Sequence, residues 1–88
     1  MEVVLLTQEG CNPCGRVKRI LVGLQAEDPA LHLREVPFDS PEGLDLTVGN
    51  SVVYPPAVFI DGRLVAKGRI HEEDLRAALT SDIRKAPR

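Results

Sequence analysis

The chain has 88 residues, which is the size of one small domain with a modest core. Its 11 Lys and Arg residues and 13 Asp and Glu residues give a net charge of −2, which argues against nucleic acid as the main partner. No apolar run is long enough to span a membrane, and the first residues lack the features of a signal peptide. We therefore expect a single cytoplasmic domain over residues 1–88, monomeric and without a membrane partner, whose tail frays at about residues 84–88.

The first part of the chain predicts two strands joined by a helix. Residues 3–7 form a continuous apolar run, as expected of a strand that is covered on both faces. The apolar residues that follow have the spacing of one helix face: Val17, Ile20, Leu21 and Leu24. Asp28 should end this helix because Pro29 disfavours helical geometry in the residue before it. Residues 31–38 then indicate a strand at a sheet edge, since Pro37 cannot donate to a neighbouring strand.

A second helix is predicted after residue 40. Ser40 is an expected N-cap, and Pro41 suits the first helical position. Gly43 and Gly49 make this helix weak, because glycine lowers helix propensity. The prolines at 55–56 should end it.

The last part of the chain predicts a hairpin followed by a helix. Residues 57–60 are an apolar run that predicts a strand, and residues 63–67 are the returning strand; Asp61 and Gly62 between them are the strongest short hairpin signal in the sequence. His71 is expected as the N-cap of a final helix, whose first turn is acidic. The resulting order, βαβαββα, predicts one mixed sheet with helices on both faces.

The only two cysteines, Cys11 and Cys14, lie between the first strand and the first helix. We expect Cys11 at the helix start, where backbone N–H groups and the helix dipole stabilise a thiolate, and Cys14 one turn later. Pro13 restricts the backbone between them. In a reducing cytoplasm such a pair is more often catalytic or metal-binding than structural. A zinc site would need two more ligands, and the expected topology places His32 and His71 away from Cys11.

Two motifs make the chain resemble the thioredoxin-like superfamily, in its small glutaredoxin-sized form. Residues 11–14 carry Cys-Asn-Pro-Cys after the first strand, and residues 56–62 are similar to the Pro-x-x-Phe-Ile-Asp-Gly segment of glutaredoxins. The resemblance covers about residues 2–80. It implies an α/β fold, the minimal thioredoxin fold, with four strands in the order 2-1-3-4 and helices on both faces. It also implies a cis peptide bond between Pro55 and Pro56.

This pattern predicts a thiol–disulfide oxidoreductase that reduces protein or small-molecule disulfides. The Cys11 thiolate would attack a substrate disulfide, and Cys14 would resolve the mixed disulfide, so that the two cysteines form the redox-active disulfide. A groove beside the pair is expected to bind the substrate through four residues: Pro13, Tyr54, Pro55 and Pro56. We expect no bound cofactor and no metal, and either glutathione or a reductase as the electron source.

The sequence also departs from both well-known branches of the superfamily. Glutathione-binding glutaredoxins usually carry Thr-Val before the cis-proline and Gly-Gly followed by Asp after the hairpin. Here Tyr54 and Pro55 precede the proline, and residues 67–69 are Lys-Gly-Arg. Thioredoxins have a buried acid six residues before the first cysteine and a tryptophan directly before it, where this chain has Leu5 and Gly10.

Three interpretations of these departures remain open. Pro55 has no N–H, so one backbone hydrogen bond to an extended substrate cannot form, and glutathione should bind more weakly or in another position. The protein could still be a glutathione-dependent glutaredoxin. In a different class, Cys11 could hold an iron–sulfur cluster or another soft metal between two chains.

Basic residues near the two motifs are further candidates. Arg16 or Lys18 could add positive charge beside Cys11. Arg63, Lys67 and Arg69 could meet a carboxylate of the substrate, although scattered charges are more often a solvated surface.

Overall fold

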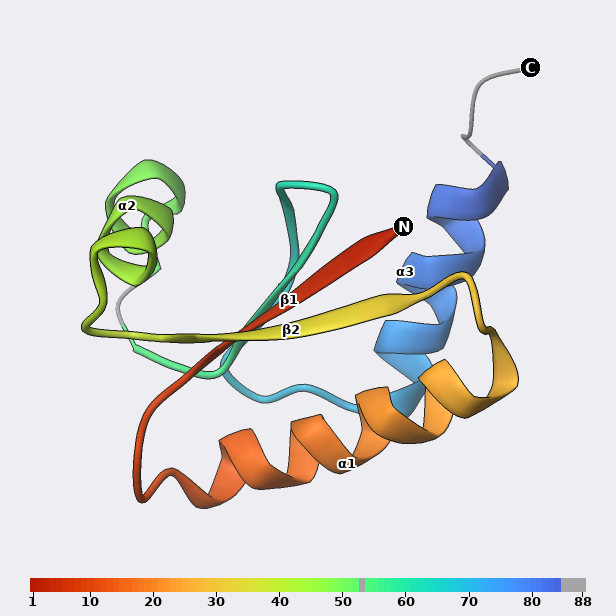
Figure 1. The fold of residues 1–88 in the computed structure, drawn as a ribbon, viewed down its shortest axis with the longest axis horizontal. Coiled ribbons are helices and arrows are strands. Elements are labelled where there is room, and N and C mark those ends of the chain that lie inside the picture. Colours follow the sequence, from red (N-terminus) through yellow and green to blue (C-terminus); the bar gives the residue numbers. More distant parts are fainter. Residues whose placement is uncertain (53, 85–88) are drawn as a thin grey trace.

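The structure is a computed structural model that describes residues 1–52 and 54–84. Its elements follow the predicted βαβαββα order (Figure 1). Their bounds are Glu2–Thr7 for β1, Asn12–Glu27 for α1, His32–Pro37 for β2, Pro41–Asn50 for α2, Ala57–Ile60 for β3, Arg63–Lys67 for β4 and Glu72–Arg84 for α3. Helix α3 includes Arg84, and the rest of the expected frayed tail, 85–88, lies outside the described residues.

The four strands form one sheet in the order β2-β1-β3-β4, as the resemblance implied. Strand β1 runs parallel to β2 and antiparallel to β3, and β3 is antiparallel to β4. Strand β2 is therefore an edge strand, which explains how it tolerates Pro37 at its last position. The predicted fold class is confirmed.

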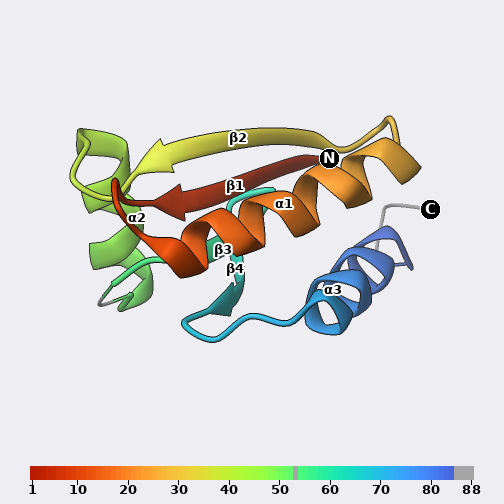
Figure 2. The same cartoon turned by 90° about the horizontal axis from the view of Figure 1, so that it is seen from below.

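Alternating side chains of β1 face two separate core layers. Val3 and Leu5 point to the layer that contains α1 and α3, whereas Val4 and Leu6 point to the layer beneath α2. Figure 2 shows α1 and α3 together on one side of the sheet and α2 on the other. Because both faces are covered, all four residues are buried, which accounts for the unbroken apolar run in the sequence.

Local hydrogen bonds explain where the second helix begins. The N–H of Gly43 donates to Ser40 Oγ over 3.0 Å, and Pro41 takes the first turn, as predicted. Ser40 Oγ in turn donates to the carbonyl of Pro37, and this hydrogen bond closes the turn between β2 and α2. Asp61 and Gly62 both have positive φ, the geometry of a tight hairpin turn.

Helix α3 begins one residue after His71, at the place expected for its N-cap. The N–H of Asp74 donates to the His71 carbonyl over 3.0 Å, and the N–H of His71 donates to the Asp74 carboxylate over 3.3 Å. Glu72, Glu73 and Asp74 supply the predicted acidic first turn. None of the helices within residues 1–52 and 54–84 has the length and apolar character needed to cross a membrane.

An arginine on β2 ties β1 and α2 together through two carboxylates. Arg34 donates to Glu2 over 3.1 Å and, with both terminal nitrogens, to Glu42 over 2.6 and 2.7 Å. Chiefly through these hydrogen bonds, Arg34 holds the pKa of Glu42 below its ordinary value. A carboxyl with a lowered folded-state pKa stabilises the fold above its unfolded pKa of about 4.3, and this contribution disappears as pH falls through the folded value.

Arg34→Gln is accordingly expected to reduce stability slightly near neutral pH and to have a smaller effect in acid. The contribution is modest because these side chains are exposed. Urea unfolding of both proteins at about pH 7 and about pH 3 measures it. Arg19→Gln removes a charge that has no carboxylate partner in the described part of the chain, and it should give no such pH-dependent difference. If Arg34→Gln lowered the free energy of unfolding equally at both pH values, the ion pair with Glu42 would not be the cause.

Candidate active site

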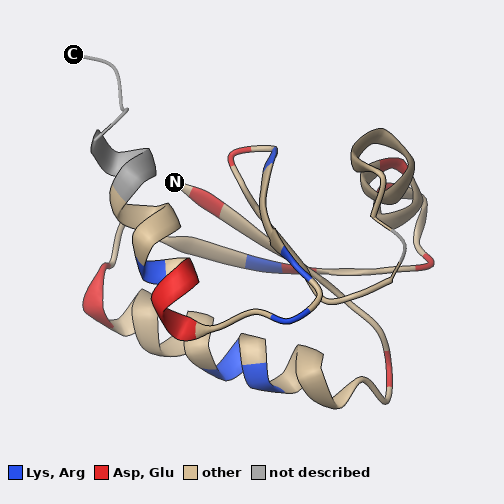
Figure 3. Ribbon diagram, turned by 180° about the vertical axis from the view of Figure 1, so that it is seen from behind, with Lys and Arg blue, Asp and Glu red and all other residues tan. Residues whose placement is uncertain are grey.

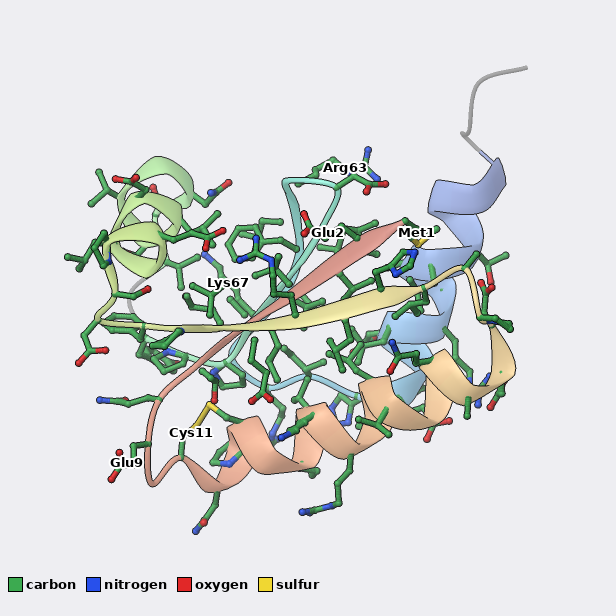
Figure 4. All side chains as sticks on the ribbon, viewed as in Figure 1. Met1, Glu2, Glu9, Cys11, Arg63 and Lys67 are labelled. Atoms are coloured by element: carbon green, nitrogen blue, oxygen red, sulfur yellow. A yellow bond between two sulfur atoms is a disulfide. The ribbon has the colours of Figure 1, made fainter. Side chains whose placement is uncertain are left out.

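The two cysteines lie at the junction of β1 and α1 and are bonded to each other (Figure 4). Cys11 is the N-cap of α1, as predicted, and its Cα lies 5.3 Å from that of Cys14. The backbone N–H of Cys14 donates to the Cys11 sulfur over 3.1 Å. The sulfur of Cys11 therefore accepts one of the N–H groups that have no partner inside the helix.

The two sulfur-bearing residues differ in exposure. Cys14 is only 2% exposed and belongs to the buried face of α1, together with Val17 and Leu21. Cys11 is half-buried, because the cap position lies before the first helical turn and faces outward. An incoming molecule can therefore reach Cys11 but not Cys14.

A groove of about 620 Å³ opens beside Cys11. It is lined by Gln8, Gly10, Cys11, Asn12, Pro13, Arg16, Tyr54, Pro55, Pro56, Gly68 and Arg69. The lining, which comes from three separate segments, contains all four residues expected to bind substrate. Their placement agrees with the expectation, while their role in binding stays a prediction.

Pairing between strands explains why these segments meet. Because β1 and β3 are antiparallel, Leu6 near the end of β1 lies beside Ala57 at the start of β3. The chain just before β3 is therefore carried to the cysteine pair. The bond between Pro55 and Pro56 is cis, as the resemblance implied, and the Pro56 carbonyl accepts the N–H of Gly68 over 2.9 Å.

Neither a protein-family model nor a curated protein matches this sequence. Solved structures do match over most of the chain. Reduced Escherichia coli glutaredoxin is 22% identical, with a TM-score of 0.66 over 96% of this chain and 99% of its own. Oxidised thioredoxin O2 from Arabidopsis thaliana is 18% identical, with a TM-score of 0.67 over 91% of this chain and 72% of its own. A thioredoxin-like protein is 25% identical, with a TM-score of 0.65 over 85% of this chain and 96% of its own. The chain has the thioredoxin fold.

Within this thioredoxin fold, the structure adds groove residues that the sequence did not single out. Gln8 and Asn12 flank Cys11, and both line the groove. The expected βαβαββα topology contained a signal for them, since the loop after β1 and the start of α1 must lie where the chain enters β3. Arg69, which was more readily interpreted as part of a solvated surface, also lines the groove.

Of the two basic residues expected near Cys11 on α1, only Arg16 lies along the groove. One of its terminal nitrogens donates to the Ile70 carbonyl, which links α1 to the segment before α3. Lys18 instead forms an ion pair with Glu35 on β2, 2.9 Å between Nζ and Oε2. The structure therefore favours Arg16 as the source of positive charge.

No acidic side chain is buried beneath the cysteine pair in the described residues. Leu5, at the place of the buried acid of thioredoxins, is fully buried in the apolar core. Thr47 is the only buried polar or charged side chain among the residues whose burial is described. His32 and His71 do not line the groove, and no group of three or more potential metal ligands occurs within residues 1–52 and 54–84.

Proposed function

We propose that the protein is a cytoplasmic thiol–disulfide oxidoreductase that reduces protein or small-molecule disulfides. The observation that supports this most strongly is the asymmetry of the pair. Cys11 is reachable from a groove and caps a helix, whereas Cys14 is buried and within bonding distance of it. One sulfur is thus suited to attack a substrate and the other to act only on its neighbour.

In the first step, the Cys11 thiolate of the reduced protein attacks one sulfur of the substrate disulfide. A bond forms between Cys11 and that sulfur, the substrate S–S bond breaks, and the other substrate sulfur leaves as a thiolate. The N–H of Cys14 and the positive end of α1 stabilise the attacking thiolate and so lower the pKa of the Cys11 thiol.

In the second step, Cys14 attacks the Cys11 sulfur of the mixed disulfide. The Cys11–Cys14 bond forms, the bond to the substrate breaks, and the second substrate thiolate departs. Two electrons have then passed from the protein to the substrate. No buried acid or base lies near Cys14 in the described residues, so either water or a departing substrate thiolate would accept its proton.

Turnover requires a reductant for the Cys11–Cys14 disulfide, either glutathione or a dedicated reductase. Pro13, Tyr54, Pro55 and Pro56 form the apolar wall against which the substrate chain would lie. The protein would work as a monomer, without a bound cofactor and without nucleic acid or membrane as a partner, and would contribute to cellular redox homeostasis.

A reduction assay on the reduced protein tests the proposal. Reduction of insulin and of a small disulfide is followed with glutathione and then with thioredoxin reductase as the electron source. We expect reduction well above the rate without protein with at least one source. Anaerobic purification tests the carrier alternative, because a coloured, iron-containing dimer that lacks reductase activity would overturn the proposal.

Pro55 provides a further test of how substrates bind. It is buried at the groove and has no N–H to offer to an extended ligand. Pro55→Val restores this donor and is expected to strengthen glutathione binding about five-fold, which corresponds to one hydrogen bond of about 1 kcal/mol. Calorimetric titration of glutathione into the reduced protein measures the change.

Pro55→Ala is the matched variant, because it restores the same N–H with a smaller side chain. Both variants should bind glutathione more tightly than the wild type. Unchanged or weaker binding by both would show that the missing donor does not limit affinity.

A further inference from the structure

The charges along the groove are all positive. Arg16 and Arg69 line it beside Cys11, and no Asp or Glu is among the lining residues. Lys67, together with Arg69 and Tyr54, lines the adjoining depression. Figure 3 shows basic positions both in α1 and in the segment that leads from β4 to α3. The groove is therefore a locally cationic surface on a protein whose net charge is −2.

These three cations differ in their partners from Lys18, Arg34 and Arg76; Arg19 also lacks a carboxylate partner in the described part of the chain, but it does not line the groove. Lys18, Arg34 and Arg76 are paired with carboxylates of the chain itself. In the described part of the chain, by contrast, Lys67 and Arg69 have no carboxylate partner, and Arg16 donates only to a backbone carbonyl. All three are exposed, so their charges are available to a ligand.

The nearest negative charge in sequence does not cancel this surface. Glu9 is exposed and is not a lining residue. Figure 4 shows its side chain at the outer side of the loop that precedes Cys11, directed away from the body of the protein. The charged side chains that line the groove beside Cys11 are therefore both arginines, Arg16 and Arg69.

We propose that Arg16, Lys67 and Arg69 select disulfides that are flanked by carboxylates. This inference rests on the proposed reductase function and names its substrate class. A planar guanidinium can hold a carboxylate through two hydrogen bonds, which orients the ligand as well as attracting it. The substrate would place its disulfide at Cys11 and its acidic groups along Arg69 and Lys67.

Three disulfide-linked peptides that differ only in their flanking residues test the proposal: one flanked by glutamates, one by glutamines and one by lysines. We expect the reduced wild type to react fastest with the acidic peptide and slowest with the basic one. Each groove cation should contribute about two- to five-fold, as exposed ion pairs do. The preference should diminish when ionic strength is raised from about 0.01 M to about 1 M, since salt screens exposed charges.

Arg69→Gln is the decisive variant, because Arg69 has no described structural contact to lose. It should slow reduction of the acidic peptide about two- to five-fold more than reduction of the glutamine peptide, so that the ratio of the two rates falls. Arg63→Gln is the matched control, because it removes the same charge from the far end of β4 and should leave the preference intact (Figure 4). Oxidised glutathione, a small disulfide rich in carboxylates, is assayed beside the peptides to show whether the selected substrate is a peptide or a small molecule.

The outcomes separate this inference from the function on which it rests. If none of the disulfides is reduced, the oxidoreductase proposal fails. If all three peptides are reduced at one rate, or if Arg69→Gln and Arg63→Gln alter the preference equally, reductase function stands and carboxylate selection is overturned.

Discussion

Cys11→Ser is expected to lower disulfide reduction to the rate seen without protein. The serine hydroxyl is not ionised at neutral pH and cannot form a disulfide, so the first step has no nucleophile. Because the cap position accepts an N–H from residue 14, and serine is a favourable N-cap, the variant should still fold. The loss of activity would therefore be a loss of chemistry, which a circular dichroism spectrum like that of the wild type would establish.

Cys14→Ser is expected to behave differently, because the first step remains possible and the second does not. The variant should accumulate a mixed disulfide through Cys11, visible by mass spectrometry as the added mass of the part of the substrate that stays bonded to Cys11. Multiple turnover through the dithiol route should be lost. Equal activity of the wild type and both serine variants would falsify the redox assignment.

Gly43→Ala is expected to cause the largest loss of stability among single-methyl substitutions in the helices. A Cβ at this position would lie 2.1 Å from the Pro37 carbonyl oxygen and 2.6 Å from that of Phe38. Both atoms are backbone, and the Pro37 oxygen is held by hydrogen bonds from the N–H and the hydroxyl of Ser40. Overpacking of this kind costs about 1–3 kcal/mol, and it should exceed the usual gain in helix propensity on replacing glycine by alanine.

Gly49→Ala is the matched control within the same helix. A Cβ there would meet no atom within 4 Å, so the propensity gain of about 0.5–1 kcal/mol should appear as added stability. Urea unfolding of the wild type and both variants measures the two changes. If both substitutions changed stability in the same direction, the close approach of backbone atoms at Gly43 would not be what makes alanine unfavourable there.

The sequence predicted the fold well because its local signals agree with one another. The Ser40 cap, the Asp61-Gly62 turn and the proline after Asp28 each end or begin an element where the structure does. The alternation along β1 could not be read from the sequence, since both of its faces are apolar and only tertiary packing assigns them to two layers.

The candidate site was predicted less completely than the fold. Cys11 and Cys14 are recognisable from their spacing alone, because two cysteines one helical turn apart are close enough to form a disulfide. The positions of Arg16 and Arg69 depend on how α1 and the segment after β4 meet across the sheet edge. That packing decides which of the exposed basic residues line the groove. The sequence has no periodic pattern that would identify them.

We propose that Cys11 is the ionised, accessible thiol of the reduced protein and that Cys14 is the protected one. The most direct test is the rate of iodoacetamide alkylation of the reduced wild type as a function of pH, with mass spectrometry locating the modified cysteine. Cys11 should be alkylated first, and the rate of its alkylation should rise with pH with a midpoint below about 8.5, the pKa of an ordinary cysteine thiol. Equal alkylation of both cysteines, or a midpoint at or above that value, would contradict this proposal.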